Sequence, residues 1–133
     1  MLRLSFIEAF CVMAISKQQK ATSTLDEIRC AVSAIEEKKG ENICVLDVHD
    51  KSSITDYMIF ASGTSDPHIK AIKKALDESL GQAGIQLLGE DGAADSGWIV
   101  VDAFDFVIHL QTKEMRERYQ IEQLWRDARK VEL

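Results

Sequence analysis

Two groups of residues have types and spacing that could support a chemical role: a Gly63-Thr64-Ser65 turn and the two aspartates Asp102 and Asp105. The turn precedes a helical pattern, where free backbone N–H groups could hold a phosphate. Because it lacks a P-loop lysine and the G-x-G-x-x-G spacing, we interpret it first as a helix cap and keep nucleotide binding as the alternative. The two aspartates could hold a metal ion, but no third ligand is near them in the sequence. Neither group alone predicts a catalytic site.

Other nucleophilic and metal-binding side chains occur singly. Ser65 lies three residues before His68, but no acid that could orient the histidine can be placed, so the pair is typical of a helix start. The cysteines and histidines show no metal-ligand spacing: Cys11, Cys30, Cys44, His49, His68 and His109. We therefore predict no catalytic residues, no metal, no cofactor and a reducing, cytoplasmic location. His109 is expected to pack or to form a hydrogen bond.

Charge is distributed unevenly along the chain. The 133 residues include 16 basic and 22 acidic side chains, which gives a net charge of −6. Residues 75–112 contain no Lys or Arg, and their seven acids are Asp77, Glu78, Glu90, Asp91, Asp95, Asp102 and Asp105. Residues 113–133 hold six basic and five acidic residues, a net of +1, so residues 1–112 carry −7. This balance predicts little direct contact with nucleic acid and favours a basic protein partner.

Trp98 lies inside this basic-free segment, at the start of a predicted strand over residues 98–102. A second strand is predicted over residues 105–110, and the short separation predicts an antiparallel hairpin. A two-residue loop would place Trp98 opposite His109 and would pair Asp102 with Asp105. Because Ala-Phe is a poor two-residue turn, a longer or bulged loop would shift this pairing.

Alternation along the two strands assigns their faces. One face is purely apolar and is predicted to lie on the core: Ile99, Val101, Phe106, Ile108 and Leu110. The other face is mixed, and with three loop acids it forms our predicted partner-binding surface: Trp98, Val100, Asp102, Asp105, Val107, His109, Glu90, Asp91 and Asp95. In this interpretation Trp98 is the anchor and the carboxylates form an acidic rim. The alternative is that a helix covers this face and makes Trp98 a core residue.

The elements before the hairpin must position this surface. A helix is predicted from Thr24, which begins a T-x-x-E capping box, to a stop at Gly40. A second helix is predicted from its cap at Ser65 to Gly81 or Gly84, because apolar residues recur at helical spacing. Three strands are predicted before the hairpin: Ile43–Val48, Tyr57–Ala61 and Ile85–Leu88.

The C-terminal residues 113–119 and 121–129 are predicted to be helical, with Tyr119, Leu124 and Trp125 packing the last helix onto the body. Strands that alternate with helices and end in a hairpin indicate an α/β fold, a mixed sheet of about five strands with flanking helices.

The length of 133 residues predicts a single domain, which we place at residues 23–130. Residues 1–22 are interpreted as an N-terminal extension, either an extra helix or a poorly ordered segment, with residues 16–23 as a linker. Glu8 interrupts the first apolar stretch, which is too short to span a bilayer, so neither a signal peptide nor a membrane anchor is favoured.

Several short motifs follow one another in order along the chain. Five of them lie between residues 45 and 109: Val45-Leu46-Asp47-Val48, Lys51-Ser52-Ser53-Ile54-Thr55-Asp56, Ala61-Ser62-Gly63-Thr64-Ser65, Ser96-Gly97-Trp98-Ile99-Val100-Val101-Asp102 and Val107-Ile108-His109. In this order they resemble the ribosomal silencing factor family, also called Iojap-like proteins. The segment 116–125 resembles the family signature R-x-x-Y-x-L-E-x-L-W, with Ile121 in place of its first Leu. The chain departs from the family pattern at Phe104, where a glycine is usual, and at Gln111, where an aromatic or apolar residue is common.

The resemblance implies a fold like that of nucleotidyltransferases without their catalytic residues. It also implies a role without catalysis, in which the protein binds the large ribosomal subunit through universal large-subunit protein fourteen and sterically blocks subunit joining, so that translation is repressed. The family's contact tryptophan corresponds to Trp98. The open alternatives are a diverged nucleotidyltransferase that binds a nucleotide at residues 63–65, and a homodimer that forms through the Trp98 surface away from the ribosome.

Overall fold

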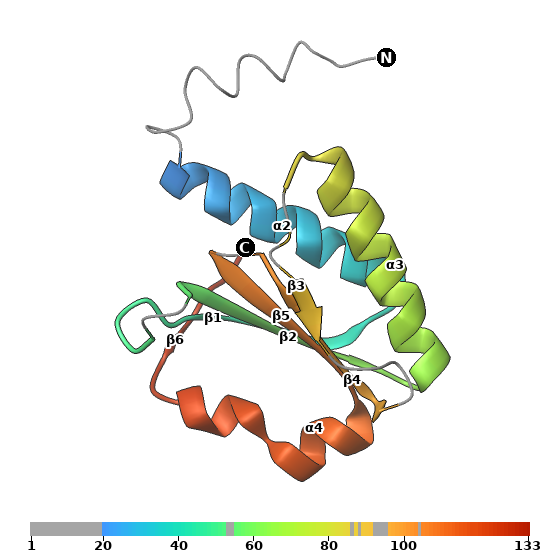
Figure 1. Ribbon diagram of the computed structural model, residues 1–133. Helices are drawn as coiled ribbons and strands as arrows, with labels where there is room; N and C mark the ends of the chain where they lie inside the picture. Colours follow the sequence, from blue (N-terminus) through green and yellow to red (C-terminus); the bar gives the residue numbers. More distant parts are fainter. Residues whose placement is uncertain (1–19, 53–54, 86, 88, 92–95, 104) are drawn as a thin grey trace.

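A mixed sheet forms the centre of the molecule and carries helices on both faces (Figure 1). The computed structural model describes residues 20–52, 55–85, 87, 89–91, 96–103 and 105–133. Within them the elements follow one another as α2 (Lys20–Glu37), β1 (Glu41–Asp47), β2 (Tyr57–Gly63), α3 (Asp66–Gln82), β3 (Gly89–Asp91), β4 (Trp98–Asp102), β5 (Phe106–Thr112), α4 (Lys113–Tyr119), the 3₁₀-helix η2 (Ile121–Trp125) and β6 (Arg129–Lys130). The α/β class with a mixed sheet is confirmed.

The sheet has six strands in the described residues, in the order β3-β4-β5-β2-β1-β6. The central pair β2 and β5 is parallel, and every other neighbouring pair is antiparallel. The sixth strand, β6, has only two residues and pairs with Leu46 and Asp47 at the end of β1. The expected five strands are therefore extended by one short edge strand.

Helices α2 and α3 pack side by side on one face of the sheet (Figure 1). Their apolar stripes meet the alternate residues of the strands, because side chains of a strand point to opposite faces in turn. The resulting core is closed to solvent, and its largest side chains are Ile28, Ile35, Ile59, Ile69, Ile72, Leu76, Leu80, Phe106, Ile108 and Leu110. The predicted apolar face of the hairpin is thus confirmed as the core side.

The start of α2 differs from the sequence expectation. The helix begins at Lys20, so Thr24 lies inside it and is not its cap, and residues 20–23 of the expected linker are helical. The Thr24 hydroxyl instead donates a hydrogen bond to Asp105 Oδ2, at 3.4 Å. At the other end, Lys39 adopts the left-handed conformation (φ 64°) that we expected at Gly40. Residues 1–19 lie outside the described residues.

Two further elements are placed differently. The third strand is β3, at Gly89–Asp91, inside the segment expected to be a loop, whereas Ile85 and Leu87 lie outside any strand. The expected final helix is a single 3₁₀ turn, η2, followed by β6. In contrast, α3 begins as predicted: the Ser65 hydroxyl accepts a hydrogen bond from His68 N at 3.3 Å, and a proline stands in the first turn.

The hairpin of β4 and β5 has a different register from the expected one. Trp98 pairs with Gln111, Val100 with His109 and Asp102 with Val107, so the expected pairing of Asp102 with Asp105 is wrong. The loop is longer than two residues, and Asp105 precedes β5 instead of facing Asp102. A shift of two positions keeps every side chain on its predicted face, because the side-chain period of a strand is two.

Helix α4 and η2 cross the opposite face of the sheet, below it in Figure 1. Neither element has a buried residue, and Tyr119 and Leu124 are 51% and 76% exposed. The expected packing onto the body is therefore wrong for Leu124, whereas the ring of Tyr119 does contact the body, with its centroid 5.3 Å from that of Trp98. Trp125 packs as predicted: it is half-buried against a small second cluster of Leu46, Val48 and Phe60.

Candidate functional site

Four aromatic rings from four different elements form a row on the α4 face of the sheet. Phe60 of β2 stacks on His109 of β5 with a centroid distance of 5.0 Å and an angle of 10°. Trp98 of β4 follows at 6.1 Å from His109, and Tyr119 of α4 lies 5.3 Å from Trp98. Burial falls along this aromatic row, from closed Phe60 through half-exposed Trp98 to Tyr119 at the surface. The row thus links the interior to an exposed aromatic edge.

Trp98 is held in place by the residues on either side of it. Gly97 has φ +80° and sits against α4, where a Cβ would lie 2.9 Å from Met115 Cγ and 3.1 Å from Thr112 Oγ1. Its carbonyl accepts a hydrogen bond from Thr112 N at 2.9 Å, which ties the start of β4 to the end of β5. Only glycine meets both the backbone conformation and the close approach without strain. The backbone before Trp98 is therefore fixed.

A hydrogen bond to His109 orients the indole of Trp98. Trp98 Nε1 donates a hydrogen bond to His109 Nδ1 at 3.3 Å, so this nitrogen must carry a lone pair and not a proton. Burial lowers the pKa of His109 to about 4, because the imidazolium cation would lose its hydration there. The ring is consequently neutral at physiological pH and remains an acceptor. The prediction that His109 packs or forms a hydrogen bond is confirmed, since it does both.

Gln111 lies beside Trp98 in the sheet and beside Ser62 of β2. Its side chain is 1% exposed, and neither Nε2 nor Oε1 has a hydrogen-bond partner among the described residues. A buried amide without partners carries a desolvation cost on the order of 1–3 kcal/mol. The family resemblance marks this position as unusual, and the structure shows that its polar group gains no hydrogen bond in exchange.

The structure places the remaining residues of the predicted surface at different distances from the row. Val100 is half-buried and Val107 is buried on the same face. Asp102 also shares this face but lies four residues along β4 from Trp98, about 13 Å at the usual strand rise. Asp105 lies beyond the start of β5 and contacts Thr24 at the helical side. The surface is therefore more extended than a ring around Trp98.

The three loop acids of the prediction are only partly described. Glu90 and Asp91 are in β3, where they pair with Val101 and Val100 at the β4 edge of the sheet. Asp95 lies outside the described residues. Their contribution to the acidic rim thus remains an expectation.

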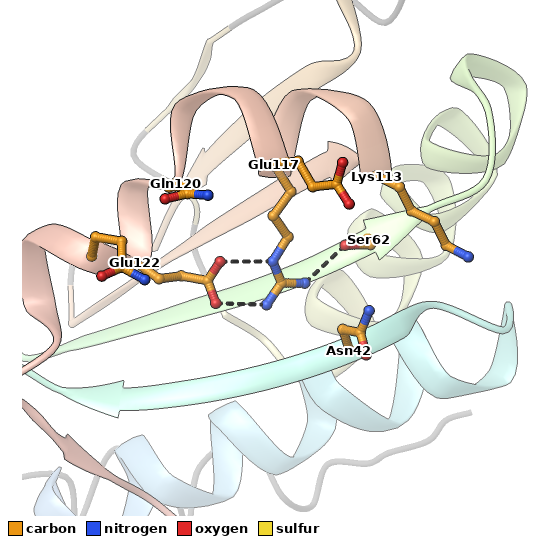
Figure 2. Close-up of a pocket in the computed structure, with 8 residues that line it drawn as sticks. Asn42, Ser62, Lys113, Glu117, Gln120 and Glu122 are labelled. Carbon is orange, nitrogen blue, oxygen red and sulfur yellow. Dashed lines mark hydrogen bonds and ion pairs between the residues drawn. The ribbon is translucent and has the colours of Figure 1, made fainter.

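A polar hollow of about 400 Å³ lies between α4, η2 and the ends of β1 and β2 (Figure 2). Arg116 is one of its lining residues, and its guanidinium donates hydrogen bonds from Nε and Nη2 to Glu122 at 2.8 and 2.9 Å and from Nη1 to Ser62 Oγ at 2.8 Å. The hydrogen bonds from Arg116 hold the pKa of the Glu122 carboxyl below its usual range. This bidentate pair joins α4 to η2 and to β2, so the polar groups of the hollow serve to fix the two outer segments.

The Gly63-Thr64-Ser65 turn borders another hollow of about 410 Å³, where Thr112 and Arg118 also reach the wall. Its own polar groups are engaged locally. Thr64 N donates to His68 Nδ1 at 2.9 Å, and His68 Nε2 donates to the Lys38 carbonyl at 2.7 Å. Ser65 Oγ accepts from backbone N–H as a cap, so the serine and histidine are not arranged as a nucleophile and its base.

Neither a cluster of metal ligands nor a membrane-spanning helix is found in the part of the chain that the structure describes. There, no group of three or more His, Cys, Asp or Glu side chains comes close enough to hold a metal ion. In the same residues no helix combines the length and the apolar character that crossing a bilayer demands.

Tyr119 is the site residue that sequence reasoning missed. Its place at the end of a helical pattern with apolar neighbours indicated a contact that packs the last helix onto the body, and the structure shows that contact, with Trp98, at the exposed end of the aromatic row. The available signal was the small size of the last segment: a seven-residue helix cannot bury both of its sides.

Comparison with known proteins relates the chain to a protein family. Residues 20–133 match the family model described as "Ribosomal silencing factor during starvation". The chain is 41% identical over 87 residues to the ribosomal silencing factor RsfS of Haemophilus influenzae, covering 65% of this chain and 85% of that protein. It is 33% identical over 105 residues to the mouse mitochondrial assembly of ribosomal large subunit protein 1, covering 74% of this chain and 45% of the mouse protein.

A solved structure supports the same relationship. The crystal structure of a protein from Chromobacterium violaceum superposes with a TM-score of 0.73 at 34% sequence identity. The match covers 76% of this chain and 84% of the other. The resemblance noted in the sequence motifs is confirmed by the family model and by the Haemophilus influenzae relative.

Proposed function

Because the chain belongs to the ribosomal silencing factor family, we propose that it binds the large ribosomal subunit and represses translation by preventing the small subunit from joining. The proposed contact is universal large-subunit protein fourteen. The mechanism is steric exclusion, so it requires no catalytic residue and no cofactor. It requires only an interface that occupies the surface where the two subunits would meet.

The observation that carries this proposal is the half-exposed Trp98 within the basic-free segment. An aromatic side chain that is held rigidly and is still open to solvent on one side has the properties of an interface anchor. Ribosomal proteins are basic, and a chain with a net charge of −6 would be steered toward such a partner. The same charge disfavours direct adhesion to ribosomal RNA. We propose the cytoplasm as the location, where the ribosomes are.

A homodimer is a competing use of the same surface. Two copies that met through Trp98 would cover the anchor, so a dimer away from the ribosome would reduce the concentration of binding-competent protein. This form would be expected to dissociate when large subunits are added.

The test compares Trp98→Ala and Trp98→Phe for co-sedimentation with isolated large ribosomal subunits. We expect Trp98→Ala to weaken binding by at least ~2 kcal/mol, about 30-fold in Kd, as for other aromatic anchors. The free energy of unfolding should fall by only about 1 kcal/mol, because the ring is half-exposed. Trp98→Phe should keep most of the binding, since it retains an aromatic ring.

Two results would contradict the proposal. If Trp98→Ala lowers the free energy of unfolding by ~3 kcal/mol or more, Trp98 belongs to the core and the assignment of this surface is wrong. If the wild-type chain does not sediment with large subunits, the ribosomal role fails. A thermal shift with nucleoside triphosphates would then favour the alternative of nucleotide binding at residues 63–65.

A further inference from the structure

A hollow of about 580 Å³ lies between η2, β6 and β1, beside the polar hollow shown in Figure 2. The two hollows share Asn42, Arg116 and Glu122 as lining residues. Along β1 the larger one extends from Asn42 to Leu46, about 13 Å at the usual strand rise. This β1 hollow, as we call it, has a volume typical of sites for small molecules.

Part of the lining of the β1 hollow is apolar. Leu46 belongs to the small second cluster, and Cys44, Trp125 and Ala128 pack against that cluster. Burial raises the pKa of the Cys44 thiol, against the opposing effect of the Lys130 ammonium, so this side chain is uncharged at neutral pH and behaves as a small hydrophobe. Together these side chains offer contact area to an apolar group.

The charged lining residues divide into a paired and an unpaired set. Arg116 and Glu122 are joined by two hydrogen bonds, at 2.8 and 2.9 Å, and need no partner from a ligand. Arg126 and Lys130 form no ion pair with another described residue. Hydrogen bonds from Arg116 lower the pKa of the Glu122 carboxyl most, and Lys130 adds to this effect, which places the Lys130 charge close to the hollow. The cations without a partner are thus Arg126 and Lys130.

The charge around the β1 hollow is opposite to that of the whole chain. Its lining contains three cations and a single carboxylate, a net of +2, whereas the chain carries −6. The acids nearest in sequence to the two unpaired cations, Asp127 and Glu132, are exposed and do not line it, and Glu117 lines only the polar hollow. An anion is therefore the ion that this hollow attracts.

The apolar lining and the two unpaired cations together define the ligand. An anionic head would receive charge-assisted hydrogen bonds from Arg126 and Lys130, and an apolar tail would cover Leu46, Cys44 and Trp125. We propose that the β1 hollow binds a small amphipathic anion, a carboxylate or phosphate that carries an apolar tail of medium length. The site does not include Trp98, so the proposal is independent of the ribosomal role.

The first experiment titrates the full chain with octanoate and follows the indole N–H signals by NMR. Trp125 lines the β1 hollow and Trp98 does not, so the Trp98 signal is an internal control. Octylammonium has the same tail and the opposite charge, and butyrate has the same head and a shorter tail. We expect a saturable shift of the Trp125 signal with octanoate, an affinity at least about tenfold lower for each of the other two probes, and no shift at Trp98. Octyl phosphate carries the alternative head on the same tail, and the tighter of the two octyl anions identifies the head group.

The thiols give a second measure of where octanoate binds. Octanoate should slow the alkylation of Cys44 by iodoacetamide at least about fivefold, because a bound tail would cover this half-exposed thiol. Cys30 is the internal control, since its Sγ lies 3.8 Å from the Ser79 carbonyl of α3, on the helical side of the sheet. Peptide mass spectrometry measures both rates in the same sample, and the rate at Cys30 should not change.

The second experiment removes the unpaired cations with Arg126→Gln and Lys130→Gln in one protein. We expect the affinity for octanoate to fall at least about tenfold, while the thermal unfolding midpoint is kept because both side chains are exposed. Lys70→Gln with Lys74→Gln, on the exposed side of α3, changes the net charge equally and is the matched control. Its affinity should stay within about twofold of wild type.

Four results would overturn the proposal. Octylammonium that binds as tightly as octanoate would show that the hollow does not select an anion, and butyrate that binds as tightly would show that it does not hold a tail. Equal shifts of both tryptophan signals would show nonspecific adhesion to the surface. Equal affinities of wild type and the Arg126 and Lys130 double variant would remove the head-group site. Co-sedimentation with large subunits tests the ribosomal role separately, so either proposal can fail without the other.

Discussion

The two faces of the sheet are built on different principles. Under α2 and α3 the contacts are apolar and closed to solvent, and their side chains come from both helices and from alternate strand residues. Under α4 and η2 the apolar cluster is small, and the buried groups include His109, Ser62 and Gln111. The outer segments there are held by Arg116 and Glu122 and have no buried residue of their own.

The difference indicates that the two faces of the sheet contribute differently to the stability of the fold. Apolar burial stabilises a fold in proportion to the area removed from water, so the helical face supplies most of the stability. The α4 face can therefore keep a half-exposed tryptophan, a buried neutral histidine and an unpartnered amide, all of which cost stability. Such features are expected on a face that serves binding, the role proposed for the Trp98 surface. Substitutions should then harm folding on the first face and binding on the second.

The largest expected effect compares neighbouring residues of β5 that point to opposite faces. Ile108→Ala should lower the free energy of unfolding by about 2–5 kcal/mol, because it removes a fully buried side chain from the main core. Val107→Ala on the other face should cost about 1–2 kcal/mol, since the deleted group is smaller and Val107 belongs to neither apolar cluster of the described residues. Urea unfolding of both variants measures the difference. Equal losses would show that the two faces contribute equally.

Protonation of His109 should lower the free energy of unfolding by an amount similar to that expected for Ile108→Ala. Burial holds the pKa of His109 at about 4 in the folded chain, against the ordinary value of 6.5. Between these values the unfolded chain binds a proton that the folded chain does not, so the free energy of unfolding decreases as the pH falls from 6.5 through 4. The full loss is about 3 kcal/mol. Stability curves of wild type and His109→Phe, measured across this window, isolate the contribution.

The pH comparison has a clear contrary result. His109→Phe keeps a ring on Phe60 but cannot titrate, so its curve should lack this component. If wild type and His109→Phe lose stability in parallel below pH 6.5, other groups are responsible and His109 is more open to water than its 9% exposure indicates.

Truncation of the second tryptophan should have a moderate effect. Trp125 packs on the small cluster of the α4 face but is only half-buried, so Trp125→Ala should cost about 2 kcal/mol, less than the ~3–5 kcal/mol of a fully buried tryptophan. Thermal or urea unfolding measures this loss. A Trp125→Ala protein that is stable and folded but no longer binds large subunits would make η2 part of the contact surface.

The smallest expected effect concerns steering by the acids near the hairpin. Asp102→Asn with Asp105→Asn should slow association with large subunits about threefold and flatten its salt dependence, because these charges act over a Debye length of about 8 Å. Glu36→Gln with Glu37→Gln, at the end of α2, changes the net charge equally on the helical face and is the matched control. Equal rates and salt slopes for both double variants would place the two aspartates outside the binding surface.

Sequence reasoning reached the faces of the strands but not their register. Alternation alone places Trp98 and His109 on one side of the sheet, and this held because the period of two survives a shift of two positions. The register depended on the geometry of the loop, where an Ala-Phe pair gives no clear turn signal. Similarly, the cap and apolar spacing of α3 were sufficient to locate that helix.

The misplaced elements are those whose structure depends on distant partners. Strand β3 has three residues, and its pairing with β4 is not encoded in its own pattern of Gly, Glu and Asp. Leu124 was expected to pack onto the body because apolar residues usually do, yet it is 76% exposed, and Tyr119 packs only through its contact with Trp98. Local propensity does not show which part of the sheet a C-terminal segment will meet.

The parallel pairing of β2 with β5 also has a kinetic consequence. It joins residues 49 positions apart, as from 57 to 106 and from 63 to 112, so the centre of the sheet closes only after a long loop has been ordered. The antiparallel pairing of β1 with β2 is much more local and can form earlier. Until β5 pairs with β2, the backbone N–H and C=O groups on that edge of β2 are free to pair with a strand of another chain. We therefore expect refolding to be slow for a chain of this size, and aggregation during that interval to increase with protein concentration.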